Sequence, residues 1–246
     1  MAKKKIVKKT TTTTVTTEEV VANKTQIVCI LDASSSMNSI IDEARDGFNK
    51  FIDDQKKLDD EASLTVATFS SGGANNGYEL LYDNKPINEV EHLTEKDWYG
   101  NGMTALHDAI GKAITDVSQS HKDMKKSERP DRVLVAIVTD GYENASKEFN
   151  GASIKSLIKK MEKQDWQFVY LAADQDASLA GGSIGVSRGN TLSYSNTGTG
   201  NAMMFNSLST ATVNYRGMAV TDTASASSLM ADVTDGTGKV EDKDAK

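Results

Sequence analysis

One aspartate followed by a cluster of hydroxyl side chains is the first place in the sequence where chemistry is expected. The segment CILDASSSMNS, residues 29–39, ends an apolar run at Asp32, and Ser34 and Ser36 follow at alternate positions. A carboxylate beside several hydroxyls can bind a metal, bind a phosphate or carry a covalent intermediate. The same pattern can also be no more than a serine-rich turn, so other segments have to discriminate between these possibilities.

Two further segments carry the same kind of oxygen ligand. NGMT, residues 101–104, brings Thr104 to the start of an amphipathic segment, and TDG, residues 139–141, brings Asp140 to the end of the most apolar run in the chain. Alternate residues of an extended turn face the same way, which would let Asp32, Ser34 and Ser36 face one ion. Two carboxylates and three hydroxyls, without histidine or cysteine, suit Mg²⁺, or Mn²⁺ and Ca²⁺, rather than zinc or copper.

The elements that must position these residues alternate between strand and helix. Continuous apolar runs predict buried strands at Gln26–Leu31, Ser63–Phe69, Arg132–Val138 and Gln167–Ala172, and a short strand at Thr191–Tyr194. Helical spacing of apolar residues predicts helices at Ile40–Leu58, Ala105–Lys125, Ser153–Lys163 and Asn201–Tyr215. Tyr78–Tyr82, after a glycine-rich turn, is predicted as an antiparallel edge strand. This order predicts an α/β fold with a mostly parallel sheet, in which ligands bind at the carboxyl ends of the strands.

The three oxygen-bearing segments, in this order and at these strand ends, resemble the von Willebrand factor A (vWA) domain with a complete metal-ion-dependent adhesion site (MIDAS). The segments TALHDAIG and VTDGYENAS are also similar to intracellular bacterial and phage members of that family. The resemblance implies a Rossmann-like, three-layer α/β/α fold with a six-stranded, mostly parallel sheet and one antiparallel edge strand. It further implies that the hydroxyls of Ser34, Ser36 and Thr104 ligate the metal, and that Asp32 and Asp140 hold it directly or through water.

The function implied by the resemblance is metal-dependent protein binding. An ion with few directly bound protein carboxylates stays electrophilic, and an aspartate or glutamate of a partner protein can displace one of its waters. The alternative is a structural or assembly protein, such as a component of a phage or bacterial complex, whose metal mainly stabilises the fold.

Four enzyme classes were weighed against the motifs, and none is expected. The chain has no P-loop, and Ser34 stands where a haloacid dehalogenase-type phosphatase has its second aspartate. No lysine follows the strand ends at 138 and 172, as a receiver domain would need. The Gly-x-Ser-x-Gly segment at residues 181–185 lacks the preceding strand of a nucleophile elbow, and no histidine follows Ser183.

Composition limits the partners and the compartment. The 246 residues include 28 basic and 35 acidic ones, a net charge of −7, which argues against a nucleic-acid surface. One cysteine, Cys29, cannot form a disulfide within the chain and fits a reducing compartment. No apolar segment is long enough for a membrane span, and the lysine-rich start has no apolar core of a signal peptide. We therefore predict a cytoplasmic protein without membrane contact.

The chain is predicted to contain one folded domain between two tails. Residues 1–24 are threonine- and lysine-rich and are predicted to be disordered, residues 25–216 to form the vWA domain, and residues 217–246 to form a flexible polar and acidic tail.

Several residues near the predicted site have more than one interpretation. Trp98 and Tyr99 would either line the rim of the metal face or fix their loop against the sheet. His107 is expected at the surface or behind the site, whereas Glu143 and Asn144 would shape its rim. Asp174 and Asp176 are expected to cap the following short helix.

Overall fold

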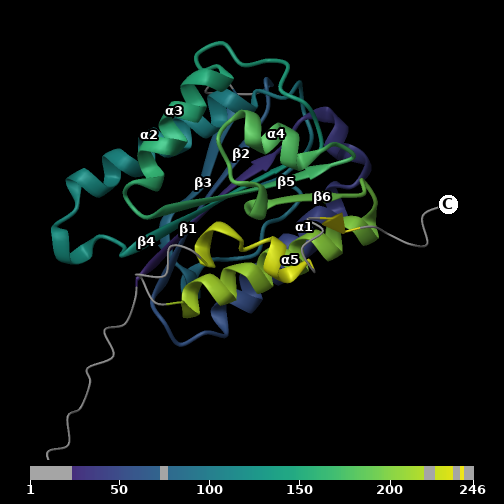
Figure 1. Cartoon of the computed structure of the whole chain (residues 1–246). Helices are drawn as coiled ribbons and strands as arrows, with labels where there is room; N and C mark the ends of the chain where they lie inside the picture. Colours follow the sequence, from purple (N-terminus) through teal and green to yellow (C-terminus); the bar gives the residue numbers. More distant parts are fainter. Residues whose placement is uncertain (1–23, 73–76, 219–224, 235–238, 241–246) are drawn as a thin grey trace, which may run out of the picture.

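A seven-stranded sheet forms the centre of the computed structural model, which describes residues 24–72, 77–218, 225–234 and 239–240 (Figure 1). The strands are β1 (Thr25–Asp32), β2 (Ala62–Phe69), β3 (Tyr78–Pro86), β4 (Arg132–Thr139), β5 (Trp166–Ala173), β6 (Thr191–Tyr194) and β7 (Lys239–Val240). Their order is β3-β2-β1-β4-β5-β6-β7, and only the β2–β3 pair is antiparallel. The six predicted strands, one of them the antiparallel edge strand, are therefore confirmed, and the two-residue β7 is an addition beyond β6.

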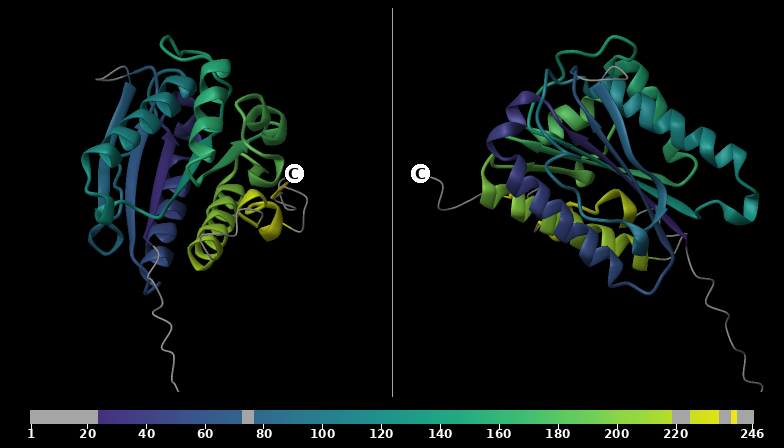
Figure 2. Two further views of the ribbon diagram at one scale, coloured as in Figure 1. Left: turned by 60° about the vertical axis from the view of Figure 1, so that its left-hand side comes forward. Right: turned by 180° about the vertical axis from the view of Figure 1, so that it is seen from behind.

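Helices cover both faces of the sheet and complete a three-layer α/β/α arrangement (Figure 2). One face carries α1 (Ile41–Lys56) and α5 (Gly198–Gly217), and the other carries α2 (Leu106–Asp123), α3 (Gly151–Glu162) and α4 (Ala177–Ser183). The alternation of side chains in β4 shows why the strands have continuous apolar sequences. Leu134, Ala136 and Val138 face the core under α1 and α5, and the residues between them face the core under α2 and α3. Burial on both faces removes the polar alternation of a half-exposed strand.

The path of the chain reverses direction across the sheet between β1 and β4. From β1 the chain passes through α1 to β2 on one side, and it later returns to β4 on the other side of β1. The order of strands reverses at this point, and α/β sheets bind their ligands there. Leu31 pairs with Val138, so Asp32 and Thr139, the last residues of β1 and β4, lie side by side.

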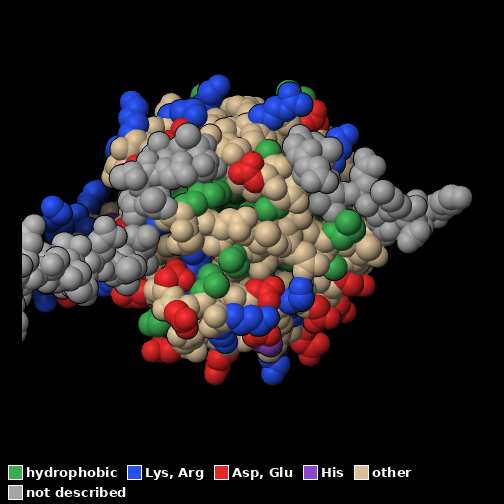
Figure 3. All heavy atoms as spheres, turned by 60° about the horizontal axis from the view of Figure 1, so that its bottom comes forward, with side chains coloured by type: hydrophobic (Ala, Val, Ile, Leu, Met, Phe, Trp, Pro, Cys, Tyr) green, Lys and Arg blue, Asp and Glu red, His purple; other side chains and the backbone are tan. Residues whose placement is uncertain are grey.

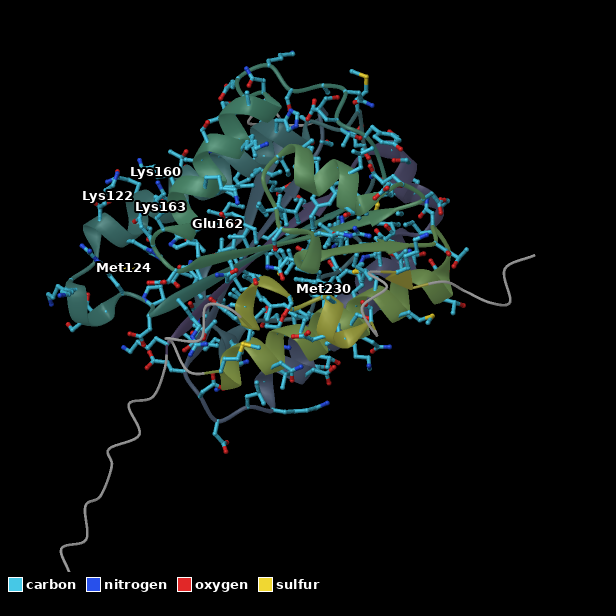
Figure 4. All side chains as sticks on the ribbon, in the orientation of Figure 1. Lys122, Met124, Lys160, Glu162, Lys163 and Met230 are labelled. Carbon is cyan, nitrogen blue, oxygen red and sulfur yellow. The ribbon has the colours of Figure 1, made fainter. Side chains whose placement is uncertain are left out.

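The carboxyl-terminal segment corrects one predicted boundary. Residues 225–234 do not belong to a flexible tail: Ala226, Leu229 and Met230 are buried in the core cluster that includes α5. Met230, labelled in Figure 4, lies beside α5 on that face of the sheet. The backbone N–H of Met230 donates to the carbonyl of Gly189, which ties the segment to the loop before β6. The predicted amino-terminal tail, apart from Lys24, lies outside the described residues.

The outer surface of the α1 and α5 layer is predominantly polar. In the space-filling view, hydrophobic side chains show only in small separate patches, and acidic side chains gather toward the lower margin (Figure 3). Helix α1 alone exposes Asp42, Glu43, Asp46 and Asp53. None of the described helices is long and apolar enough to span a lipid bilayer.

Candidate metal site

Asp32 ends β1 with a fully buried carboxylate that two donors hold in place. Its Oδ1 accepts the backbone N–H of Ser34 at 2.7 Å, and its Oδ2 accepts the hydroxyl of Thr139 at 2.6 Å. Burial raises the pKa of Asp32 to about 6, although these hydrogen bonds act in the opposite direction. The sheet therefore fixes a carboxylate at its edge and surrounds it with neutral groups.

The hydroxyls of the first loop connect this carboxylate to the end of β4. Ser34 Oγ lies 3.0 Å from Ser36 Oγ, and Ser36 Oγ donates to Asp140 Oδ1 at 2.7 Å. The predicted side-chain convergence occurs, but the predicted reason for it is wrong. Ser34 is extended, whereas Ser36 lies in a short 3₁₀ helix over Ser35–Ser39, so a bend and not an extended turn brings the two hydroxyls together.

Thr104 reaches the same place from the loop before α2. Its side chain is buried, its N–H donates to Asn144 Oδ1 at 2.9 Å, and its carbonyl accepts the N–H of Asn144 at 3.0 Å. A Cβ at Gly141 would lie 3.2 Å from Thr104 Oγ1 and 3.9 Å from Ser36 Oγ. Glycine at this position lets the TDG backbone approach both hydroxyls. The structure therefore brings all five predicted residues to one point between β1 and β4: Asp32, Ser34, Ser36, Thr104 and Asp140.

The charge of this cluster fits a divalent cation. Asp140 Oδ2 is buried and has no hydrogen-bond partner among the described residues, and burial raises the pKa of Asp140. No described lysine, arginine or histidine forms an ion pair with Asp32 or Asp140. A buried carboxylate without a countercharge is costly, and a metal ion would supply that charge. The donors are hard oxygens, which match Mg²⁺ better than zinc.

The loop of residues 98–102 packs directly on the serine loop. Trp98 is fully buried, its Nε1 donates to the carbonyl of Asp32 at 2.8 Å, and its ring meets Phe48 edge-on. A Cβ at Gly100 would lie 2.8 Å from the carbonyl oxygen of Ser34, so only glycine allows this close approach. Of the two interpretations left open by the sequence, Trp98 fixes the loop, whereas Tyr99 is exposed at its surface.

Glu143 fastens the loop after β4 to the first turn of α2. Its carboxylate accepts four hydrogen bonds: from the N–H groups of His107, Ala145 and Ser146, and from the Ser146 hydroxyl. Burial acts to raise the pKa of Glu143, but these hydrogen bonds outweigh it and hold the pKa below the usual value. The ring of His107 lies beside the same carboxylate, with Nδ1 3.7 Å from Oε2. Both residues therefore support the loops of the site.

The remaining predictions near the site have mixed outcomes. Asp176 caps α4 by accepting the N–H of Leu179, as predicted, whereas Asp174 accepts the N–H of Asn196. The Gly-x-Ser-x-Gly segment runs through the end of α4 and has no strand leading directly into it. The sequence analysis missed Thr139, whose hydroxyl orients Asp32. Its position, directly before Asp140 at the end of an apolar strand, was the available signal.

A family profile described as the von Willebrand factor type A domain matches residues 26–199. The chain belongs to the von Willebrand factor type A (vWA) family. Members of this family are commonly adhesion or protein-interaction modules, and they often bind a divalent metal at the MIDAS. A search of curated proteins finds no match.

Solved structures of low sequence identity share the vWA fold. Proximal thread matrix protein 1 from the mussel byssus is 17% identical with a TM-score of 0.53, over 76% of this chain and 46% of its own. The pilus adhesin SpaC from Lactobacillus rhamnosus GG is 11% identical with a TM-score of 0.55, over 76% of this chain and 30% of its own. The SpRpn10 VWA domain is 13% identical with a TM-score of 0.50, over 76% and 95%. The chain thus spans less than half the length of the mussel protein.

Proposed function

We propose that this vWA domain is a non-catalytic module that binds a partner protein through Mg²⁺ at the MIDAS. The observation that carries the proposal is the buried carboxylate of Asp32 beside the partly buried carboxylate of Asp140, in a cluster with three hydroxyls and no ion pair to a cationic side chain. Ser34, Ser36 and Thr104 would hold the ion through their hydroxyls, and the two aspartates would hold it directly or through water. When bound, the metal supplies a positive, ligand-accepting position that a partner's aspartate or glutamate can occupy.

The site has features that support recognition by a partner over a purely internal role. Ser36 is exposed and Asp140 is only partly covered, so one side of the cluster opens to solvent. A mussel relative has been solved with a zinc-occupied MIDAS motif, which supports metal binding at the corresponding position of this chain. Mn²⁺ and Ca²⁺ are the alternatives to Mg²⁺, because both also take oxygen ligands. The proposal includes a bacterial or phage origin, which rests on the sequence resemblance, and a cytoplasmic location, which rests on the single cysteine and on the sequence pattern without a predicted membrane span or signal peptide.

A second candidate function is a structural or assembly protein in which the metal mainly stabilises the fold. The same buried charges favour it, because a cation that neutralises them stabilises the folded state by mass action. Thermal melting with and without Mg²⁺, repeated with a partner extract, separates the two candidates. A large metal effect on Tm without any metal-dependent partner supports the structural role.

A pulldown from native lysate tests the proposed function. We expect partner capture in Mg²⁺, loss of capture in EDTA, and loss of capture by the Asp32→Ala variant. Asp176→Asn is the matched control, since it removes a carboxylate from the same edge of the sheet without touching the cluster. Capture that survives both EDTA and Asp32→Ala would refute the proposal.

A further inference from the structure

The loops around the MIDAS hold large apolar side chains in solvent. Tyr99, Met103 and Tyr142 are 52%, 56% and 68% exposed, and they are half of the large hydrophobic residues exposed in the described chain. Met103 directly precedes Thr104, Tyr142 lies two residues after Asp140, and Tyr99 precedes the glycine that packs on Ser34. We call these three residues the apolar rim.

Hydrogen bonds and buried neighbours fix the backbone of the loops that carry the apolar rim. Met103 exchanges two hydrogen bonds with Ser71: its N–H donates to Ser71 Oγ at 2.8 Å, and its carbonyl accepts the Ser71 N–H at 2.6 Å. Tyr142 precedes Glu143, whose four accepted hydrogen bonds fix the loop, and Tyr99 follows the buried Trp98. A partner that covers these side chains gains apolar burial without ordering the loops first, and aromatic residues presented in this way are favoured at interfaces.

The same loops contain no cationic side chain for a partner's carboxylate. Residues 33–40, 98–104, 140–146, 174–176 and 195–197 include no lysine and no arginine, and they expose Asp174 and Asp176. Figure 4 labels Lys122, Lys160 and Lys163, which lie together toward the opposite ends of α2 and α3. Lys122 lies sixteen positions after Leu106, the first residue of α2, which amounts to about 24 Å along the helix. A second acidic group on a partner would therefore meet the like charges of Asp174 and Asp176 and no cation within these loops; the cations next to them are Arg45, which donates to the carbonyl of Trp98 at 3.4 Å, and the exposed Lys147.

We propose that the partner's docking segment carries a single aspartate or glutamate flanked on both sides by apolar residues, and that an acidic run is not recognised. The carboxylate reaches the metal, and the flanking side chains cover Tyr99, Met103 and Tyr142. This inference rests on the proposed function, because it assigns the chemistry of the segment that the same site binds.

Three short labelled peptides with one central aspartate test the inference. The flanking residues are leucine in the first peptide, serine in the second and glutamate in the third, and binding to the full chain is measured by fluorescence anisotropy in Mg²⁺. We expect the leucine peptide to bind at least about tenfold more tightly than the serine peptide, since one hot-spot contact is worth about that factor. The glutamate peptide should bind most weakly because Asp174 and Asp176 repel it.

Two variants connect the preference to the rim. The double variant Met103→Ser/Tyr142→Ser should bind the leucine and serine peptides equally, and calorimetric titration with Mg²⁺ checks that its metal site still forms. Leu80→Ser is the matched control, because Leu80 is 42% exposed on the edge strand β3, away from the site loops, and should leave the preference unchanged.

The outcomes separate this inference from the proposed function. Equal binding of the leucine and serine peptides by the native chain, tightest binding of the glutamate peptide, or a preference that survives the double variant would overturn the inference alone. Failure of all three peptides to bind, or binding that persists in EDTA, would overturn the proposed function and this inference with it.

Discussion

The two ends of the parallel sheet differ in whether their buried charged side chains have a partner of opposite charge. At the amino end, the guanidinium of Arg216 is fully buried and donates to both carboxylate oxygens of Asp60, each at 2.9 Å. Arg132 is also buried there and donates to the carbonyls of Tyr215 and Met218 at the end of α5, although its Nε has no partner. At the carboxyl end, Asp32 and Asp140 accept hydrogen bonds from hydroxyls and a backbone N–H, and neither forms an ion pair with a described cationic side chain.

The difference shows which end of the sheet is complete without a ligand. Most buried polar groups named at the amino end are paired: His121 Nε2 lies 2.6 Å from Gln26 Oε1, and Gln26 Nε2 donates to Thr65 Oγ1 at 2.9 Å, whereas Thr25 Oγ1 and Arg132 Nε have no partner among the described residues. At the carboxyl end, Asp140 Oδ2 is buried and unpaired. Uncompensated buried charge lowers stability and persists where function requires it. One end of the sheet therefore stabilises the fold, and the other end has uncompensated negative charge that the proposed cation would neutralise.

Breaking the charge pair at the amino end should have the largest effect on stability. Arg216→Ala leaves Asp60 and the carbonyl of Gln55 without their donor, and we expect a loss of about 3–5 kcal/mol in the free energy of unfolding. Urea denaturation measures the loss, with the exposed Arg188→Ala as control, which should change stability by less than about 0.5 kcal/mol. The Mg²⁺ affinity of folded Arg216→Ala should match the native chain. A parallel loss of Mg²⁺ affinity would show that the two ends are coupled.

Neutralising a carboxylate at the other end should separate stability from metal binding. We expect Asp32→Asn to reduce Mg²⁺ affinity by more than about 100-fold. Mutating a residue that only orients a metal ligand usually costs about 10- to 100-fold, and Asp32 would hold the ion itself. In EDTA, the same variant should be more stable than the native chain by about 1–3 kcal/mol, because a neutral amide avoids the burial cost of the charge. Calorimetric titration and melting curves measure both quantities. Metal-free Asp32→Asn that is less stable than the native chain would contradict the comparison.

Removing the hydroxyl that orients Asp32 should have a moderate effect. Thr139→Val keeps the shape of a fully buried side chain and deletes the 2.6 Å hydrogen bond to Asp32 Oδ2. We expect Mg²⁺ affinity to fall about tenfold, as is common for groups directly behind a metal ligand. Thr212→Val, a buried threonine in α5 whose hydroxyl donates to Leu208, is the control and should leave Mg²⁺ affinity unchanged. Equal effects of the two variants would argue against a role of Thr139 in the site.

The smallest expected effect concerns pH at the amino end. Burial lowers the pKa of His121, and Arg129 lowers it further; the ring also packs against Trp166. The unfolded chain therefore binds this proton more readily, so stability is lost as the pH falls through the ordinary histidine value near 6.5. His121→Gln, which can keep the hydrogen bond to Gln26, should flatten the fall of Tm between about pH 6.5 and pH 5.5. An unchanged slope would show that His121 does not sense pH.

The strand and helix order was predictable because burial on both faces gives continuous apolar runs. Residues 191–194 of β6 have the predicted bounds, and the remaining predicted strands begin or end within a few residues of the observed ones. The polar segment after α5 misled the prediction. Its few buried apolar residues, Ala226, Leu229 and Met230, have the i, i+3, i+4 spacing of a helix face, but they lie in a short, mainly polar segment that was therefore assigned to the tail.

The five candidate ligands were predictable because the carboxyl ends of adjacent parallel strands meet at one edge. The local geometry was not, since a 3₁₀ turn at Ser35–Ser39 and the close approach of Gly100 to Ser34 depend on the packing of two loops. The supporting role of Thr139 and the exposure of Tyr142 likewise follow from the three-dimensional arrangement. Residue type and spacing therefore predicted which side chains converge, whereas packing determines how they are held and what surrounds them.

The most direct test of the central claim is a crystal structure with Mn²⁺, analysed by anomalous scattering. We expect one anomalous peak per chain, in contact with the hydroxyls of Ser34 and Ser36 and between Asp32 and Asp140, and no peak at this position in Asp32→Asn crystals grown in the same way. A native crystal without a peak in this cluster, or with its only peak elsewhere, would contradict the account.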